Sequence, residues 1–246
     1  MMREPLLEAI SIGKRFGGFV ALDAVNFTIL PGERVGLIGP NGSGKSTLVN
    51  CLSGATNSDS GMIHFDGRRV DKLPAFKRVR FGIVRSFQIP KPFASMTVLE
   101  NLHIPLHFAA GSRPATRTAR SDIDAQAMQI LEDIGLAEKA RESSANLTQV
   151  EMRKLELARA VAARPKLLIA DESMAGLSHS EVEDIVALLI RMNQRGVTII
   201  MIEHIMRAVM AFSQRLVVLV SGRKIADGAP DDVIKDKDVV GAYLGT

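Results

Sequence analysis

The chain has 246 residues, of which 46% are hydrophobic and 24% are charged, and its formal net charge is +4. This length and apolar content suffice for one large α/β domain, 1–246, and the modest, scattered charge gives no reason to expect a nucleic-acid partner. The apolar runs are far shorter than the ~20 residues of a membrane-spanning helix, and the acidic segment 1–8 lacks the apolar core of a signal peptide, so we expect a cytoplasmic protein.

Apolar and polar residues alternate at the beginning of the chain, which is typical of half-buried antiparallel strands. The pattern predicts strands at 6–12 and 24–30. Between them, residues 14–18 form a predicted Gly-rich turn that presents the aromatic ring of Phe16.

A phosphate-binding loop follows at residues 39–47, Gly-Pro-Asn-Gly-Ser-Gly-Lys-Ser-Thr, which match the pattern G-x-x-x-x-G-K-[ST] after the apolar run 35–38. Its glycines let backbone N–H groups approach phosphate oxygens, and the next helix adds a favourable dipole. Lys45 would reach the β- and γ-phosphates, and the Ser46 hydroxyl would bind magnesium. The predicted ATP-binding residues of this loop are Gly39, Asn41, Gly42, Ser43, Gly44, Lys45, Ser46 and Thr47. A helix at 46–53 follows, with the single cysteine, Cys51, predicted to pack in the core.

The middle of the chain changes from strands to helices. A strand is predicted at 83–89, and capping-box patterns at 97–100 and 121–124 then predict two helix starts. The polar, basic stretch 111–120 between them has no periodicity and indicates a solvated loop. We place a helical subdomain at about residues 90–163.

The last third again alternates apolar runs with helical patterns. Strands are predicted at 167–171, 197–202 and 215–220, and helices at 178–194 and 204–213. Such continuous apolar strands indicate a parallel sheet covered on both faces, and with the P-loop they predict an α/β P-loop NTPase.

Two acidic residues, Asp171 and Glu172, end the first of these strands. An aspartate there can hold magnesium through water, and the neighbouring carboxylate can accept a proton from the water that attacks the γ-phosphate.

The order of P-loop, helical insertion, amphipathic helix 155–160, acidic strand end and late histidine resembles the nucleotide-binding domain of ABC transporters over essentially the whole chain. The resemblance implies a mixed sheet core, an antiparallel β subdomain and a helical subdomain. It implies that Phe16 stacks on adenine, that Gln88 contacts magnesium and the attacking water and signals to the membrane subunit, and that His204 contacts the γ-phosphate. The catalytic residues are then Lys45, Gln88, Glu172 and His204, and the magnesium ligands Ser46, Gln88 and Asp171.

Shorter segments of the sequence indicate a particular subfamily of these ATPases. Segments 14–18, 171–177 and 202–204 and the C-terminal tail, about 223–246, look like those of the ATPase subunits of branched-chain amino acid importers and their urea or amide relatives. The resemblance implies an ATP-hydrolysing subunit that lies peripherally on the inner face of the membrane through integral permease subunits and serves a solute-binding protein indirectly. Two alternatives remain open: an export-type ATPase, since lipopolysaccharide exporters have similar tails, and a non-catalytic module that binds ATP to hold an assembly together.

One motif departs from the family pattern. In the family, two subunits enclose two ATP molecules, and each site combines one P-loop with the partner's signature, Leu-Ser-Gly-Gly-Gln. Residues 147–151 are Leu-Thr-Gln-Val-Glu instead, so that Val150 replaces a glycine and Glu151 adds negative charge. The altered signature positions are Thr148, Gln149, Val150 and Glu151, and Ser178 also stands where aspartate is usual.

The pattern Thr148-x-x-Glu151 is itself a capping box, so we hypothesise that this helix start is self-capped and a poor ligand for a partner's ATP. The residues that act on the chain's own ATP are retained. We therefore expect a heterodimer with a second ATPase subunit of intact signature rather than a homodimer. The alternative is that the substitutions are tolerated because backbone donors remain.

Overall fold

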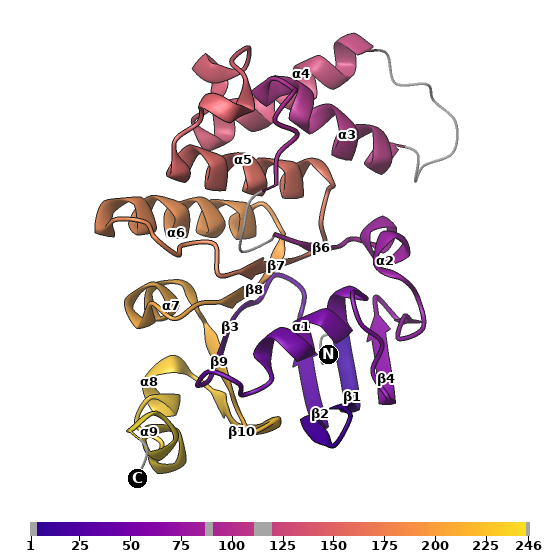
Figure 1. The fold of residues 1–246 in the computed structure, drawn as a ribbon, viewed down its shortest axis with the longest axis vertical. Helices are drawn as coiled ribbons and strands as arrows, with labels where there is room; N and C mark the ends of the chain where they lie inside the picture. Colours follow the sequence, from indigo (N-terminus) through magenta and orange to yellow (C-terminus); the bar gives the residue numbers. More distant parts are fainter. Residues whose placement is uncertain (1–3, 87–90, 111–119, 245–246) are drawn as a thin grey trace.

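The computed structural model describes residues 4–86, 91–110 and 120–244 (Figure 1). Its strands are β1 (Leu7–Phe16), β2 (Phe19–Ile29), β3 (Arg34–Ile38), β4 (Ser60–Phe65), β5 (Arg68–Arg69), β6 (Ile83–Arg85), β7 (Leu167–Asp171), β8 (Thr198–Ile202), β9 (Arg215–Val220) and β10 (Arg223–Gly228). They form an antiparallel sheet of order β2-β1-β4-β5 and a second sheet of order β10-β9-β3-β8-β7-β6. The second sheet is parallel except for β10, so the prediction of a mixed core sheet beside an antiparallel one is confirmed.

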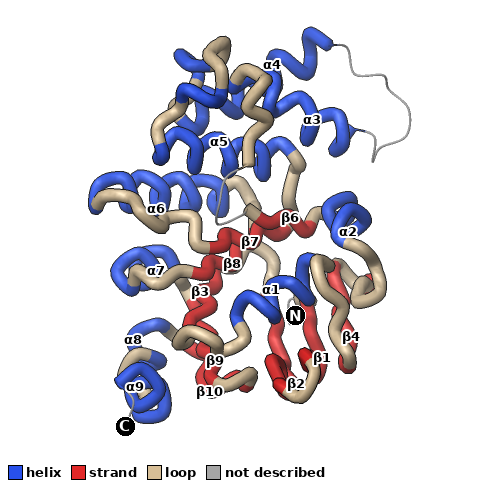
Figure 2. The backbone as a smooth tube through the Cα atoms, viewed as in Figure 1, coloured by secondary structure: helices blue, strands red, loops and turns tan. Residues whose placement is uncertain are grey.

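The helices lie on both sides of the mixed sheet (Figure 2). They are α1 (Lys45–Ser53), α2 (Ala75–Phe81), α3 (Val98–Ala110), α4 (Arg120–Ile134), α5 (Gln149–Ala162), α6 (His179–Gln194), α7 (Met206–Phe212), α8 (Pro230–Val233) and α9 (Lys237–Leu244). Figure 1 shows α3, α4 and α5 together at one end of the molecule, beyond α6, whereas α1 lies toward the antiparallel sheet. None of these helices is both long and apolar enough to cross a bilayer.

The strands of the mixed sheet bury alternate residues on opposite faces, as the two-residue period of a strand requires. In β7, Leu167 and Ile169 pack with α1 and the antiparallel strands, whereas Leu168 and Ala170 pack with the helices of the other face. Both faces are therefore covered, which explains why the strand sequences are continuously apolar.

Several predicted elements have different bounds in the structure. The first strand continues to Phe16, so the predicted turn at 14–18 is reduced to two glycines. The strand predicted at 83–89 ends at Arg85, and residues 87–90 lie outside the described residues. The capping box predicted at Ser121 is wrong in position, because α4 begins before it, at Arg120. The carboxylate of Asp124, which that box would use, lies 2.7 Å from the His103 ring on α3 instead.

A buried arginine that the sequence analysis did not identify closes the C-terminal end of α1. Arg78 is fully buried, and its guanidinium donates to the carbonyl oxygens of Cys51 at 2.5 Å and Leu52 at 2.8 Å. It also donates to the carbonyls of Leu73 and Asp71, each at 2.8 Å. Carbonyls at a helix end lack partners within the helix, so this one cation fixes the helix that follows the P-loop.

Replacing Arg78 with alanine should lower the free energy of unfolding by ~3 kcal/mol, because it leaves a cavity and several buried carbonyls without donors. Urea unfolding followed by circular dichroism measures the change. The matched control is Lys77→Ala, which removes an exposed side chain from the same helix. Equal stability of the two variants would contradict a role for Arg78 in holding α1.

Candidate ATP site

The P-loop joins β3 to α1 and has the backbone that its glycines predict. Gly39, Gly42 and Gly44 all have positive φ angles, of 152°, 77° and 102°. A Cβ atom on Gly39 would lie 2.1 Å from the Leu219 carbonyl oxygen, so only glycine fits there. Lys45 Nζ donates to the Gly39 and Pro40 carbonyls at 2.7 and 3.0 Å, which holds the ammonium at the mouth of the loop.

The loop lines a polar pocket of about 210 Å³ together with residues from distant parts of the chain. The pocket is lined by Phe19, Ala21, Asn41, Gly42, Ser43, Gly44, Lys45, Ser46, Thr47, Glu172 and His204. All the predicted P-loop residues except Gly39 therefore converge with Glu172 and His204 in one place.

The acidic residues reach the pocket because β7 and β8 end at the same edge of the sheet. Asp171 pairs with Ile202 in register, so that Glu172 and, one residue further along, His204 follow the ends of neighbouring strands. Glu172 has a positive φ of 46°, and its N–H donates to the Ile202 carbonyl at 2.9 Å. Its Oε1 lies 3.0 Å from His204 Nε2, as the pairing of a base with a second group that orients it requires.

The charges of the pocket act on Lys45. Burial lowers the pKa of its ammonium, and the nearby Glu172 and Asp171 carboxylates oppose that shift. The ammonium is thus influenced by two negative charges, to which a bound triphosphate would add more. The Ser43 hydroxyl in the same loop is buried and has no hydrogen-bond partner among the described residues. An anion with oxygen acceptors fits this donor set.

Of the two predicted magnesium ligands among the described residues, only one lines the P-loop pocket. Ser46 lines the pocket. Asp171 is 7% exposed and makes an ion pair with Arg85 at 2.5 Å. Gln88, the third predicted ligand, lies outside the described residues. A hydroxyl and a carboxylate are oxygen ligands of the type that magnesium prefers, so these two residues fit the ion.

Two aromatic residues lie at the tip of the β1–β2 hairpin, where sequence reasoning identified one. Phe16 pairs with Phe19 across the turn, and the two side chains are 53% and 62% exposed. Phe19, not Phe16, is among the residues that line the P-loop pocket. Lys14 lies over the Phe16 ring, 5.4 Å from its centroid.

The altered signature is capped from within the chain, which confirms the predicted capping box. Thr148 N–H donates to Glu151 Oε2 at 2.9 Å, and Glu151 N–H donates to Thr148 Oγ1 at 3.4 Å. Lys139 pairs with the other carboxylate oxygen at 2.8 Å, and this contact lowers the pKa of Glu151. The negative charge expected from Glu151 is thus partly neutralised.

The signature also contacts the segment after the acidic strand end. Gln149 Nε2 donates to the Ala175 carbonyl at 3.3 Å. A Cβ atom on the neighbouring Gly176, which has a φ of 80°, would lie 2.7 Å from the Gln149 side chain. None of residues 148–151 lines the P-loop pocket, so the signature is separate from the chain's own ATP site.

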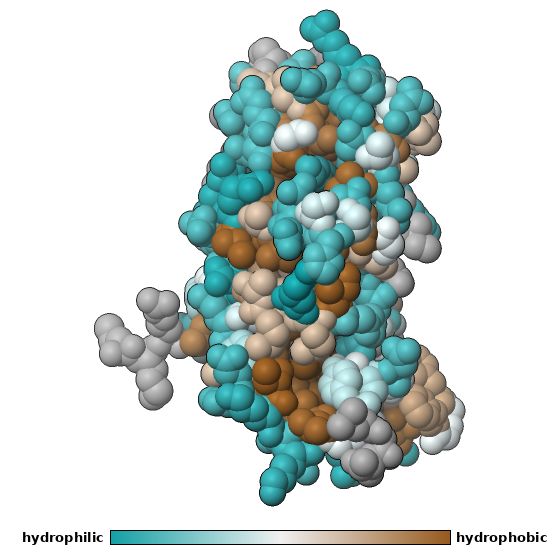
Figure 3. Space-filling model, turned by 90° about the vertical axis from the view of Figure 1, so that its left-hand side faces the viewer, coloured by the Kyte–Doolittle hydropathy of each residue, from teal (hydrophilic) through white to brown (hydrophobic). Residues whose placement is uncertain are grey.

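The C-terminal helix reaches the strand that feeds the P-loop, a contact that sequence patterns did not reveal. Ile38, the last residue of β3, lines an apolar groove of about 340 Å³ with Met206, Ile234, Val239, Val240 and Tyr243. Figure 3 views the molecule from the side of α7, α8 and α9 and shows apolar side chains gathered low on this face. Burial raises the pKa of the Tyr243 phenol, and the nearby N–H of Gly39 partly offsets the shift.

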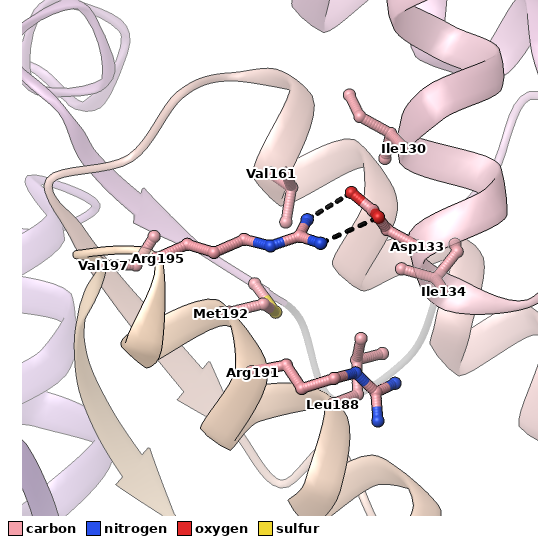
Figure 4. A pocket seen from close by; sticks show the side chains of 9 residues that line it. All are labelled: Ile130, Asp133, Ile134, Val161, Leu188, Arg191, Met192, Arg195 and Val197. Atoms are coloured by element: carbon pink, nitrogen blue, oxygen red, sulfur yellow. Dashed lines mark hydrogen bonds and ion pairs between the residues drawn. The ribbon is translucent and has the colours of Figure 1, made fainter.

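A smaller pocket of about 80 Å³ lies between α4 and the end of α6 (Figure 4). Arg195 and Asp133 face each other across it, with Arg195 Nη2 2.8 Å from Asp133 Oδ1. Its other walls are mostly aliphatic, and the ion pair holds the Asp133 pKa below its usual range. The pocket lies where α4 and α5 meet the end of α6, and none of the predicted ATP-binding residues lines it.

Comparisons with known proteins agree with this arrangement. Residues 22–175 match the family model described as ABC transporter, and residues 223–246 match the model described as branched-chain amino acid ATP-binding cassette transporter. The chain is 38% identical to the high-affinity branched-chain amino acid transport ATP-binding proteins BraF of Pseudomonas aeruginosa and LivG of Escherichia coli, over 99% of each chain. A crystal structure of a nucleotide-free ATP-binding cassette from an ABC transporter aligns with a TM-score of 0.87 and 31% identity, covering 99% of this chain and all of the other.

Proposed function

The chain belongs to the ABC transporter family, and from this membership we propose that it hydrolyses ATP to power an importer of branched-chain amino acids. The observation that carries the proposal is the convergence of Lys45, Glu172 and His204 in one polar pocket. The C-terminal match and the two relatives named for branched-chain amino acid transport support the choice of solute.

The contacts in the pocket support the following roles for its residues. The P-loop N–H groups and Lys45 hold the β- and γ-phosphates, which the fixed positive φ angles of the glycines make possible. Ser46 and Asp171, with Gln88 as the resemblance implies, would hold a magnesium ion, which would neutralise charge on the phosphates. Glu172 accepts the proton of the attacking water, and His204 orients the Glu172 carboxylate through their 3.0 Å contact.

The proposed function also implies other subunits with which this chain would assemble. The chain pairs with a second ATP-binding subunit and couples through its helical subdomain, about residues 90–163, to permease subunits on the cytoplasmic face of the membrane. A solute-binding protein acts only indirectly. The capped signature supports a heterodimer, because two of its N–H groups, those of Thr148 and Glu151, already have acceptors within the chain.

The experiment that tests the function is transport in the source organism. Deleting the gene should abolish high-affinity uptake of radiolabelled leucine, and expression of the wild-type chain should restore it, whereas the Glu172→Gln variant should not. Uptake of glucose serves as the control for general effects on the membrane. Unchanged leucine uptake after deletion would contradict the assigned solute.

Phe16 should bind the adenine base, since the family resemblance assigns this role to it and its side chain is exposed. Replacing Phe16 with alanine should weaken ATP binding about tenfold, in keeping with a base–aromatic stack of ~1–3 kcal/mol. Titration with a fluorescent ATP analogue measures this. The matched variant is Phe19→Ala at the paired position, and a larger loss there would assign the stacking role to Phe19, which lines the pocket.

A further inference from the structure

Arg85, at the end of β6, connects two parts of the proposed ATP site. Its Nε and Nη2 donate to Asp171 Oδ2 at 3.1 and 2.5 Å. Its Nη1 donates to Asn50 Oδ1 at 2.6 Å, in the helix that begins within the P-loop. The guanidinium therefore joins the acidic strand end to the phosphate-binding helix.

The Arg85 guanidinium holds the Asp171 carboxylate by only one of its two oxygens. Both bonds from Arg85 end on Oδ2, and neither uses Oδ1. The Arg85 and Asp171 side chains are only 14% and 9% exposed, so solvent screens the pair little. A carboxylate fixed in this way keeps one oxygen, in one orientation, for a further ligand.

We propose that Arg85 is a positioning residue that orients the Asp171 carboxylate for magnesium and links it, through Asn50, to the P-loop helix. The inference rests on the proposed function, because it concerns the same nucleotide site. Groups that hold a metal-binding carboxylate in place typically contribute 10–100-fold to metal affinity. The positive charge of Arg85 has the opposite effect, since it repels a cation nearby, and the two effects predict changes of opposite sign when Arg85 is removed.

The test is the dependence of nucleotide binding on magnesium. Isothermal titration of the full chain with the non-hydrolysable analogue AMP-PNP, in magnesium and in EDTA, gives two affinities for each variant. Magnesium should enhance the AMP-PNP affinity of Arg85→Gln about tenfold less than that of the wild type. The AMP-PNP affinity in EDTA should be unchanged. Arg85→Lys, which keeps the charge and loses the planar fork, should recover only part of the enhancement.

The matched control is Arg80→Gln, which removes the same charge from an exposed position of the neighbouring helix α2 and should change neither affinity. Three results would overturn the inference: an enhancement by magnesium that is unchanged in Arg85→Gln, one that increases, and a parallel loss of both affinities. If Arg85→Gln does not fold, as thermal melting would show, an unchanged enhancement in Arg85→Lys overturns it equally. Failure of the wild-type chain to bind AMP-PNP would contradict the proposed function instead.

Discussion

Replacing Glu172 with glutamine should lower the rate of ATP turnover by ~10²–10⁴-fold while ATP binding is retained. The amide keeps the size of the side chain and can still form a hydrogen bond with His204, at the 3.0 Å separation seen here. It cannot accept a proton from water, so the loss falls on the chemical step and not on nucleotide affinity. Phosphate release from the complex with its partner subunits measures turnover, and a fluorescent ATP analogue measures binding.

The matched control for this variant is Glu183→Gln, an exposed glutamate on α6. It should have wild-type turnover. Glu172 would not be the general base if its glutamine variant kept full turnover. A simultaneous loss of ATP binding would show instead that Glu172 is needed for the shape of the pocket, in which it has a left-handed backbone conformation.

The elements around the ATP site could be predicted because each follows from a local pattern. Apolar runs predicted β3, β7, β8 and β9 within one or two residues, since a strand buried on both faces has to be continuously apolar. The glycines of the P-loop predicted its turn, and the strand ends that carry Asp171 and His204 lie together because parallel strands end at one edge.

The contacts of three long polar side chains could not be predicted in this way. Nothing in the sequence distinguishes Arg78, which is fully buried, from the exposed Arg80 two residues later. Arg85 reaches Asp171 and Asn50 only because the fold brings β6, β7 and α1 together. The pairing of Lys139 with Glu151 likewise depends on how the fold brings the short 3₁₀ helix Ala137–Lys139 to the start of α5.

Substitutions in the altered signature, residues 147–151, should also have a large effect on ATP turnover. Replacing Val150 with glycine and Glu151 with glutamine should raise ATP turnover of the chain alone on the order of 10²-fold, the amount that one backbone donor to a developing charge contributes. The wild-type chain alone should stay near the Glu172→Gln blank. Specific activity measured while the protein concentration is raised makes the comparison, because a homodimer has to form before either ATP is enclosed.

The expected rise in turnover depends on the backbone N–H donors at the start of α5. In the wild-type chain the Thr148 and Glu151 N–H groups are bonded within the capping box, and Lys139 holds the Glu151 carboxylate in place. The double variant removes a negative charge and a branched side chain from the start of α5, where a partner's phosphate would approach. Glycine within a helix also costs about 1 kcal/mol, so the melting temperature of the double variant has to be compared with that of the wild type.

The single variants separate the two causes. Glu151→Gln alone tests the charge, because glutamine can keep the capping box, whereas Val150→Gly alone tests steric access to the backbone. Lys139→Ala is the sharpest control, because it releases the Glu151 carboxylate and leaves both signature substitutions in place; it should not raise turnover. A wild-type chain whose specific activity already rises with concentration, to the level of the double variant, would show that this signature serves a homodimer and that a second kind of subunit is not required for hydrolysis.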